Sequence, residues 1–378
     1  MNQDNLHQKR ACFITMSNIR TDARTLNVID YLKDKLRITT IGFGNVEDVI
    51  HFASKGIRFI PIDEPPKMPT HKTWRYFNQK IKIIELIKAD YVWAADFFSL
   101  KSAKKIADYN DAELIYDCRE IYSKIPSLRN HKIKQWIQTN LEKHWIKSVH
   151  KIIVTGELDK NYLQKHFKNK NNFYILMNLP YYKKVQNQNL IRQNYNLSQN
   201  SKILVYQGML SEGRGLEKTI VALRQLPDFY LILLGSGKIL YHLQEMARLN
   251  GVKDKVIFKG IVPYQELLNW TASADIGLNL IEDIAFSYKL ALPNKMFEYC
   301  MAGIPVISSN LPAIEKIYTE FKIGELLQPN CSPEKLAETI INMNNQNKIK
   351  FYKSECLKAA EKYNYQNQFK IINQIFNL

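Results

Sequence analysis

Short apolar runs alternate with longer amphipathic stretches along almost the whole chain. Six runs in the first half have the length and the β-branched and aromatic content of strands, at residues 11–16, 37–43, 91–95, 113–117, 151–155 and 173–177. Apolar residues at helical spacing lie between them, near 24–36, 72–89, 98–110 and 132–147. This alternation predicts the α/β class, with parallel sheets covered by helices.

The second half repeats the alternation, with predicted strands at 203–208, 229–237, 256–260, 274–280 and 304–309. A polar segment rich in Asn and Gln, residues 178–202, separates the two sets and is the predicted linker. Beyond about residue 330 the pattern is helical. We therefore expect two facing, doubly wound domains, 1–182 and 200–358, and a C-terminal helix within 359–378 that packs back on the N-terminal domain. Ligands of such sheets bind at the carboxyl ends of the strands.

Composition agrees with a two-domain chain, because 378 residues exceed the usual size of a single core. The N-terminal apolar run is too short for a signal peptide, and no stretch approaches the roughly 18 apolar residues of a membrane span. A cytoplasmic protein is expected. The five cysteines include no CxxC pair, so neither a disulfide framework nor a zinc site is indicated.

The charge is strongly basic, with a formal net charge of +17. Residues 1–180 carry 30 Lys and Arg against 19 Asp and Glu. This excess favours polyanionic partners, namely an acidic membrane surface, nucleic acid or phosphorylated substrates. An AT-rich genome, which enriches Lys, Asn and Ile in every protein, is an alternative explanation.

The segment SYKLALPNKMFEYCMAGIPVIS, residues 287–308, combines several polar side chains with helix signals. Pro293 and Gly303 predict a short helix over 294–301, before a strand. Asn294, Lys295 and Glu298 share one face of that helix. A carboxylate can accept the vicinal hydroxyls of a ribose, and an ammonium beside free backbone N–H groups can hold a diphosphate. A surface ion pair between Lys295 and Glu298 is the alternative.

The segment PNKMFEYCMAGIPVISS is similar to the donor-site signature of the retaining family-4 glycosyltransferases of the GT-B fold. Further segments resemble the same family in the same order: TDARTLNVIDYL, ADYVWAADFFSL, ELIYDCREIYS, VYQGMLSEGRGLEKTIVAL, LILLGSG and VIFKGIVPYQELLNWTASADIGLNLI. The resemblance covers nearly the whole chain. It implies two facing Rossmann-like domains, of which the C-terminal one binds a nucleoside-diphosphate sugar.

The resemblance implies a role for Glu298 as the second Glu of the family's paired-glutamate motif, which contacts the nucleotide ribose. The first Glu should lie eight residues earlier, where this chain has Leu290. Contacts with the donor sugar must therefore be made differently, and Ser287, Tyr288 and Asn294 are the candidates.

The segment YQGMLSEGRGLE departs from the family at one of its two phosphate-binding cations. Met209 stands where the family usually has Arg, and Arg214 replaces a Lys, with Lys295 available as the second cation. Gly208 belongs to this loop. Gly235, in the GSG turn, serves either phosphate contact or a tight turn, and the loop at Gly260 resembles one that contacts the base through its main chain.

The N-terminal half supplies the expected acceptor and catalytic side. Asp96, Arg119 and Glu120 follow predicted strands, and Arg119 could stabilise the departing phosphate electrostatically. An ion-pair cluster of Asp117, Arg119 and Glu120 is the alternative. The family often has His at positions 95 and 119, where this chain has Ala95 and Arg119. Asp22 is interpreted as the N-cap of the first helix.

The basic segment 124–151 carries Trp136, Ile137, Leu141, Trp145 and Ile146 at helical spacing. A domain helix with its Trp residues packed on the sheet is the favoured interpretation. Docking on an anionic membrane that carries a lipid-linked acceptor is the other.

The resemblance therefore implies a hexosyl- or acetylhexosaminyl-transferase that uses UDP-sugar or GDP-sugar, with no metal and no other cofactor. Its expected acceptor is a glycan or a lipid-linked sugar in bacterial surface polysaccharide or glycoconjugate synthesis, in the cytoplasm or at the inner face of the membrane. A nucleotide-sugar 2-epimerase of the same fold and a non-catalytic partner subunit are the alternatives. No nucleic-acid partner is expected, because no aromatic and basic pattern of a known module is present.

Overall fold

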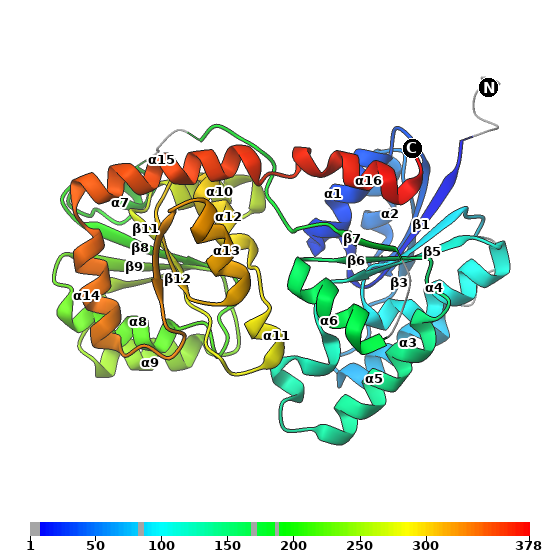
Figure 1. Ribbon diagram of the computed structural model, residues 1–378, viewed down its shortest axis with the longest axis horizontal. Helices are drawn as coiled ribbons and strands as arrows, with labels where there is room; N and C mark the ends of the chain where they lie inside the picture. Colours follow the sequence, from blue (N-terminus) through cyan, green and yellow to red (C-terminus); the bar gives the residue numbers. More distant parts are fainter. Residues whose placement is uncertain (1–7, 82–86, 168–171, 186–188) are drawn as a thin grey trace. The chain divides into compact units, whose positions relative to one another are not determined.

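The computed structural model describes residues 8–81, 87–167, 172–185 and 189–378. The chain divides into two compact units, residues 1–177 with 368–378, and residues 178–367 (Figure 1). Within the described ranges, no helix combines the length and the apolar character that crossing a bilayer requires.

Unit 1 is built on a seven-stranded parallel sheet of order β3-β2-β1-β4-β5-β6-β7. Its strands are β1 (Arg10–Asn18), β2 (Arg37–Phe43), β3 (Arg58–Ile62), β4 (Tyr91–Ala94), β5 (Glu113–Cys118), β6 (Lys151–Val154) and β7 (Asn172–Ile175). Its helices are α1 (Ala23–Leu32), α2 (Val46–Ala53), α3 (Thr70–Lys80), α4 (Phe97–Asn110), α5 (Lys132–Ile146), α6 (Glu157–Phe167) and α16 (Phe369–Phe376). The central strands β1, β4 and β5 are almost wholly buried, as expected for a sheet covered on both faces.

Unit 2 has a six-stranded parallel sheet of order β10-β9-β8-β11-β12-β13. Its strands are β8 (Lys202–Gln207), β9 (Phe229–Leu234), β10 (Val256–Gly260), β11 (Ile276–Asn279), β12 (Val306–Ser309) and β13 (Gly324–Leu327). Its helices are α7 (Leu190–Asn194), α8 (Leu216–Ala222), α9 (Leu240–Leu249), α10 (Tyr264–Ala272), α11 (Phe286–Lys289), α12 (Asn294–Met301), α13 (Pro312–Glu320), α14 (Pro333–Met343) and α15 (Gln346–Lys362). The predicted doubly wound α/β fold with a C-terminal helix is confirmed.

Several predicted bounds are wrong. The helix predicted over 72–89 ends at Lys80, and residues 87–89 are not helical, while 82–86 lie outside the described residues. Two edge strands, β3 and β13, and the helices α2 and α6 were not predicted. Both strands are short and partly exposed. Pro61 interrupts β3, and Glu325 lies within β13, so neither gives the apolar run by which the other two edge strands, β7 and β10, were predicted.

The C-terminal helix α16 packs on the sheet of unit 1. Phe376 is fully buried, with its ring stacked 5.9 Å from the ring of Trp93 and 6.1 Å from that of Phe13. The Tyr91 hydroxyl donates a hydrogen bond to the Phe376 carbonyl over 2.6 Å. The last helix thus completes the core of the unit that contains the first strand.

Replacing Phe376 by Ala should lower the free energy of unfolding of unit 1 by about 3–5 kcal/mol, because the lost ring leaves a cavity between Phe13 and Trp93. Urea denaturation followed by circular dichroism measures the change. Leu378→Ala is the matched control, since Leu378 is 49% exposed. A change below about 0.5 kcal/mol for Phe376→Ala would contradict this account of the core.

Candidate functional site

The two central strands of unit 2, β8 and β11, lie where the order of the sheet reverses. They pair through only two positions, Leu204 with Ile276 and Val205 with Gly277. In an open parallel sheet such a switch point leaves a crevice at the carboxyl ends of the strands, and ligands bind there.

Tyr299 of α12 fills the space between these strands. Its hydroxyl accepts a hydrogen bond from the Gln207 N–H at 3.2 Å and lies 3.2 Å from the Leu278 carbonyl and 3.3 Å from that of Val205. A Cβ at Gly277 would stand 2.5 Å from the Tyr299 ring, so only glycine leaves room for it. Tyr299 therefore fixes α12 against both strands.

The fixed helix directs Lys295 and Glu298 toward the end of β8. The Lys295 ammonium lies 3.6 Å from the ring centre of Tyr206. The Glu298 carboxylate accepts a hydrogen bond from the side-chain amide of Gln207, whose amide oxygen accepts one from Thr271 over 2.6 Å. Each side chain thus contacts β8, and the alternative of a Lys295–Glu298 surface ion pair does not describe this helix.

Both charged groups are only partly exposed. Burial lowers the pKa of Lys295 well below its usual range, and the positive charge of Arg214 lowers it further, while Glu298 opposes the shift. Burial also raises the pKa of Glu298, against the opposing effects of the Gln207 hydrogen bond and Lys295. Two cations therefore converge at one place in unit 2, and an anion bound between them would relieve their repulsion.

Arg214, just before α8, lies against α11. Its guanidinium is 4.6 Å from the ring centre of Tyr288. The loops that carry the two residues are joined, because the Glu282 N–H donates to the Gly213 carbonyl over 3.0 Å. Within the described chain, neither Arg214 nor Lys295 forms an ion pair with a carboxylate. Both cations lie on aromatic rings instead.

The three predicted glycines meet at the ends of β8, β9 and β10. The Gly208 N–H donates to the Leu234 carbonyl over 2.9 Å, and the Gly235 N–H donates to the Gly260 carbonyl over 2.8 Å. A Cβ at Gly235 would stand 2.0 Å from the Gly208 carbonyl oxygen, and the φ of +147° also requires glycine. The N–H groups of Gly208 and Gly235 are thus bonded within the fold, and glycine at position 235 allows these loops to pack closely.

The remaining predicted donor residues border this group. The Ser287 hydroxyl on α11 is buried and has no hydrogen-bond partner among the described residues, whereas Asn294 is exposed at the start of α12. Leu290, at the position of the family's missing Glu, is half-buried and ends α11. Met209, where the family usually has Arg, is 71% exposed.

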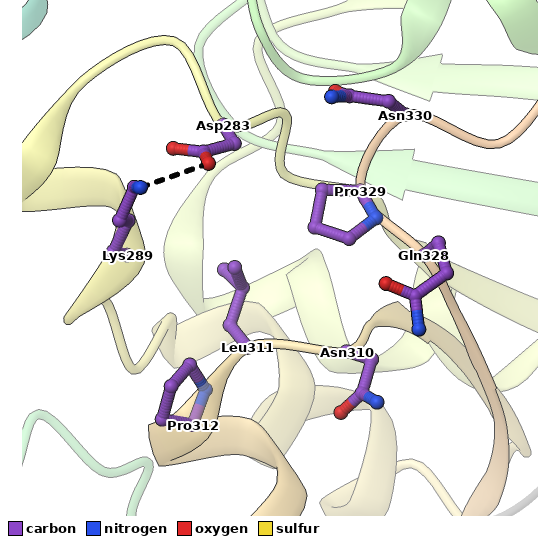
Figure 2. Close-up of a pocket in the computed structure, with 8 residues that line it drawn as sticks. All are labelled: Asp283, Lys289, Asn310, Leu311, Pro312, Gln328, Pro329 and Asn330. Carbon is purple, nitrogen blue, oxygen red and sulfur yellow. Dashed lines mark ion pairs between the residues drawn. The ribbon is translucent and has the colours of Figure 1, made fainter.

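A separate hollow of about 340 Å³ lies at the ends of β12 and β13 (Figure 2). None of the predicted donor residues lines it. Its polar side chains are the ion pair of Lys289 and Asp283, joined over 3.1 Å, and the three amides of Asn310, Gln328 and Asn330. Sequence reasoning missed this hollow, because amides in loops after edge strands have no distinctive pattern.

The predicted acceptor residues of unit 1 do not form one open group. Asp96 is the N-cap of α4, where it accepts from the Ser99 N–H over 2.7 Å, and burial raises its pKa. Glu120 is exposed. Arg119 donates to Asp117 over 3.0 Å, to Asp22 over 2.8 Å and to the Thr25 hydroxyl over 2.6 Å.

The ion-pair alternative for this loop describes Arg119 well, because the expected partner Asp117 is bonded to it; Asp22 is a further partner that was not expected. Arg24 donates to both carboxylate oxygens of Asp117, so two arginines and two aspartates form a buried network. Asp22 also caps α1 by accepting from the Thr25 N–H, as interpreted from the sequence. The network joins the start of α1 to the end of β5.

A second buried group lies behind this loop, on α5. The Glu142 carboxylate accepts a hydrogen bond from the Tyr116 hydroxyl over 2.7 Å. Burial raises the pKa of Glu142 to about 7, while its hydrogen bonds from Tyr116 and Cys118 oppose the shift. Among the residues that the structure describes, no group of three or more His, Cys, Asp or Glu side chains is placed to hold a metal ion.

Replacing Tyr299 by Phe should lower the free energy of unfolding by about 1–3 kcal/mol, because the buried Gln207 N–H loses its partner. Urea denaturation of both proteins measures the change. Tyr241→Phe, at a tyrosine that is 75% exposed, is the control and should change stability by less than about 0.5 kcal/mol. Equal stability of the Tyr299 variant and the wild type would show that this hydroxyl does not hold α12.

Glu142 should make stability depend on pH. Its raised pKa means that the folded state retains a proton that the unfolded state loses, so stability falls as the pH rises from about 4.5 to about 7, by roughly 3 kcal/mol. Glu142→Gln removes this loss and keeps an acceptor for Tyr116. Unfolding free energies at pH 5 and pH 8 should therefore diverge between the two proteins, and parallel pH profiles would contradict the assignment.

The fold of the whole chain is similar to that of several solved structures. Sucrose-phosphate synthase of Thermosynechococcus elongatus has a TM-score of 0.81 at 15% identity, with 98% of each chain covered. Anabaena HepE in complex with UDP-glucose has a TM-score of 0.77 at 16% identity, covering 98% of this chain and 100% of HepE. WaaG, a glycosyltransferase involved in lipopolysaccharide biosynthesis, has a TM-score of 0.71 at 15% identity, covering 97% and 99%.

At these identities the likeness shows the fold, which is GT-B. A search of curated protein sequences gave no significant match. Residues 187–367, which make up almost all of unit 2 and include every predicted donor residue, match the family described as glycosyl transferases group 1. This part of the chain, and with it the candidate site, therefore belongs to the glycosyl transferases group 1 family.

Proposed function

We propose that this glycosyltransferase transfers a sugar from UDP-sugar or GDP-sugar to a glycan or lipid-linked acceptor. The observation that carries the proposal is the pair of cations, Lys295 and Arg214, that converge without a carboxylate partner in the described chain. A diphosphate carries the negative charge that would neutralise these two cations.

Each part of the donor has a candidate contact in unit 2. Lys295 and Arg214 would hold the diphosphate and stabilise the negative charge that develops as the nucleotide leaves. Glu298, oriented by Gln207, would accept hydrogen bonds from the ribose hydroxyls. The backbone at Gly260 would contact the base. HepE, a neighbour in fold, has been solved in complex with UDP-glucose, which supports a nucleotide-sugar donor.

The sugar itself would lie near α11, where Leu290 replaces a glutamate. We propose that the Ser287 hydroxyl, which has no partner within the part of the chain that the structure describes, and Tyr288 contact the donor sugar there, together with Asn294. A neutral side chain in place of a carboxylate changes which hydroxyl groups of the donor sugar the site can bind. This holds whether the donor carries a hexosyl or an acetylhexosaminyl group.

Unit 1 would bind the acceptor through the loops that carry Asp96, Arg119 and Glu120. Arg119 already donates from each side-chain nitrogen, so we propose that it positions this loop and does not contact substrate. Retention of configuration and independence from metal are proposed on the family resemblance. On the same resemblance we propose a role in bacterial surface polysaccharide or glycoconjugate synthesis. We also propose a location in the cytoplasm or at the inner face of the membrane.

Two other functions use the same fold. A nucleotide-sugar 2-epimerase would consume the nucleotide sugar without any acceptor, either by converting it to the C2 epimer or, in a hydrolysing reaction, by releasing nucleoside diphosphate. A non-catalytic partner subunit is suggested by the departures at Leu290, Met209, Ala95 and Arg119. Such a subunit would leave glycan synthesis intact in cells that carry Glu298→Ala.

Binding of nucleotide sugars tests the donor site directly. A thermal-shift screen of UDP-, GDP-, CMP- and ADP-sugars should raise the melting temperature for one base, because the ligand binds only the folded state. Arg214→Ala and Glu298→Ala should each weaken that ligand about 10- to 100-fold, as expected for a lost hydrogen bond to a charged group. Nucleoside diphosphate should be released only when acceptor is present.

Arg224→Ala is the matched control, because Arg224 is exposed in the 3-10 turn that follows α8 and lies outside the site. It should bind the nucleotide like the wild type. Failure of every nucleotide to shift the melting temperature would overturn the proposed function. Equal binding by Arg214→Ala and Arg224→Ala would overturn the assignment of the cation pair.

A further inference from the structure

Helix α5 of unit 1 has two apolar faces. The inner face buries Trp145, which is 6% exposed and lies 5.5 Å from the ring of Phe97. The outer face carries Ile133, Trp136 and Ile137, which are 76%, 68% and 45% exposed. The interpretation that both tryptophans pack on the sheet is therefore wrong for Trp136.

The outer residues follow the i, i+3, i+4 spacing of a continuous apolar stripe. At 100° per residue they lie on the side of the helix away from Glu142, Trp145 and Ile146, which are buried. The core of unit 1 is complete without them. Leaving an Ile-Trp-Ile stripe in water costs free energy, and such stripes mark surfaces that bind a partner.

The charge around this stripe has one sign. Between residues 121 and 156 the chain has seven Lys and Arg, and its only acidic residue is Glu142. Glu142 is buried and bonded to Tyr116, so it neutralises nothing at the surface. Arg129, Lys132 and Lys134 are exposed and form no ion pair within the part of the chain that the structure describes.

We propose that the outer face of α5, with the loop that precedes it, docks on the surface of an anionic lipid bilayer. The three apolar side chains would enter the headgroup boundary, with Trp136 at the level that tryptophan prefers, and the basic side chains would face acidic headgroups. The proposal is independent of the donor chemistry. It places the unit that would bind the acceptor at the surface where a lipid-linked acceptor is found.

The same features disfavour other occupants. A second copy docked face to face would bring two basic helices together, which like-charge repulsion opposes. Nucleic acid would suit the lysines but would leave the Ile-Trp-Ile stripe without an apolar partner. An anionic bilayer satisfies both the charge and the apolar stripe.

Flotation of the full-length protein with lipid vesicles tests the proposal. The protein should bind phosphatidylcholine vesicles that contain about one third phosphatidylglycerol, and binding to pure phosphatidylcholine should be at least about ten-fold weaker. Lys132→Gln and Lys134→Gln should each weaken binding about five-fold, and added salt should do the same. The triple variant Ile133→Ser, Trp136→Ser, Ile137→Ser should lose binding at least about ten-fold.

The matched control is Tyr241→Ser with Leu249→Ser on α9 of unit 2, where the side chains are 75% and 72% exposed. It should bind vesicles like the wild type. Three results would overturn the proposal: no binding to anionic vesicles, equal binding to neutral ones, or binding that the triple variant retains. Sedimentation velocity that shows a dimer abolished by the triple variant would instead assign this face to a second copy. Nucleotide binding by the triple variant should match the wild type, so the test stands apart from the donor site.

Discussion

The contact of Tyr299 with β8 and β11 determines the geometry of the candidate donor site. Two parallel strands that pair at only two positions expose backbone groups where they separate, and the Tyr299 hydroxyl lies within reach of three of these groups. Because the ring occupies the space above Gly277, α12 can approach the sheet closely. The position of α12 then fixes where Lys295 and Glu298 point. The packing of this helix on β8 and β11 therefore determines where the two charged groups lie.

The charged groups at the two predicted sites differ in whether they are paired with opposite charges. In unit 1, Arg24 and Arg119 are bonded to Asp117 and Asp22, so each of these carboxylates has a cationic partner, although one nitrogen of Arg24 has no hydrogen-bond partner among the described residues. In unit 2, Lys295 and Arg214 lie on aromatic rings and repel each other. Unpaired charge is the property expected of a binding site, and paired charge that of a structural support.

Much of this could be predicted from the sequence. The strands at 37–43 and 256–260 have their predicted bounds, although β10 lies at an edge of its sheet and is mostly only half-buried. The edge strands β3 and β13 were missed, because Pro61 interrupts β3 and β13 has only four residues, one of them buried. Within the site, the short helix and its charged face were predicted. The role of Tyr299 was not, because it depends on the pairing of strands that lie about seventy residues apart. Of the partners of Arg119, Asp117 was foreseen in the ion-pair alternative, but Asp22 and Thr25 were missed for the same reason, since they are more than ninety residues away.

The central claim is that Lys295, held by α12 over Tyr206, binds the second phosphate of a nucleoside diphosphate. Isothermal titration calorimetry can compare the nucleoside diphosphate that binds, UDP or GDP, with its monophosphate. The wild type should favour the diphosphate, and Lys295→Met should reduce this preference about ten-fold or more, as expected for a lost charge-assisted hydrogen bond. Lys289→Met, at a lysine paired with Asp283, should leave the preference unchanged. An unchanged preference in Lys295→Met would contradict the account.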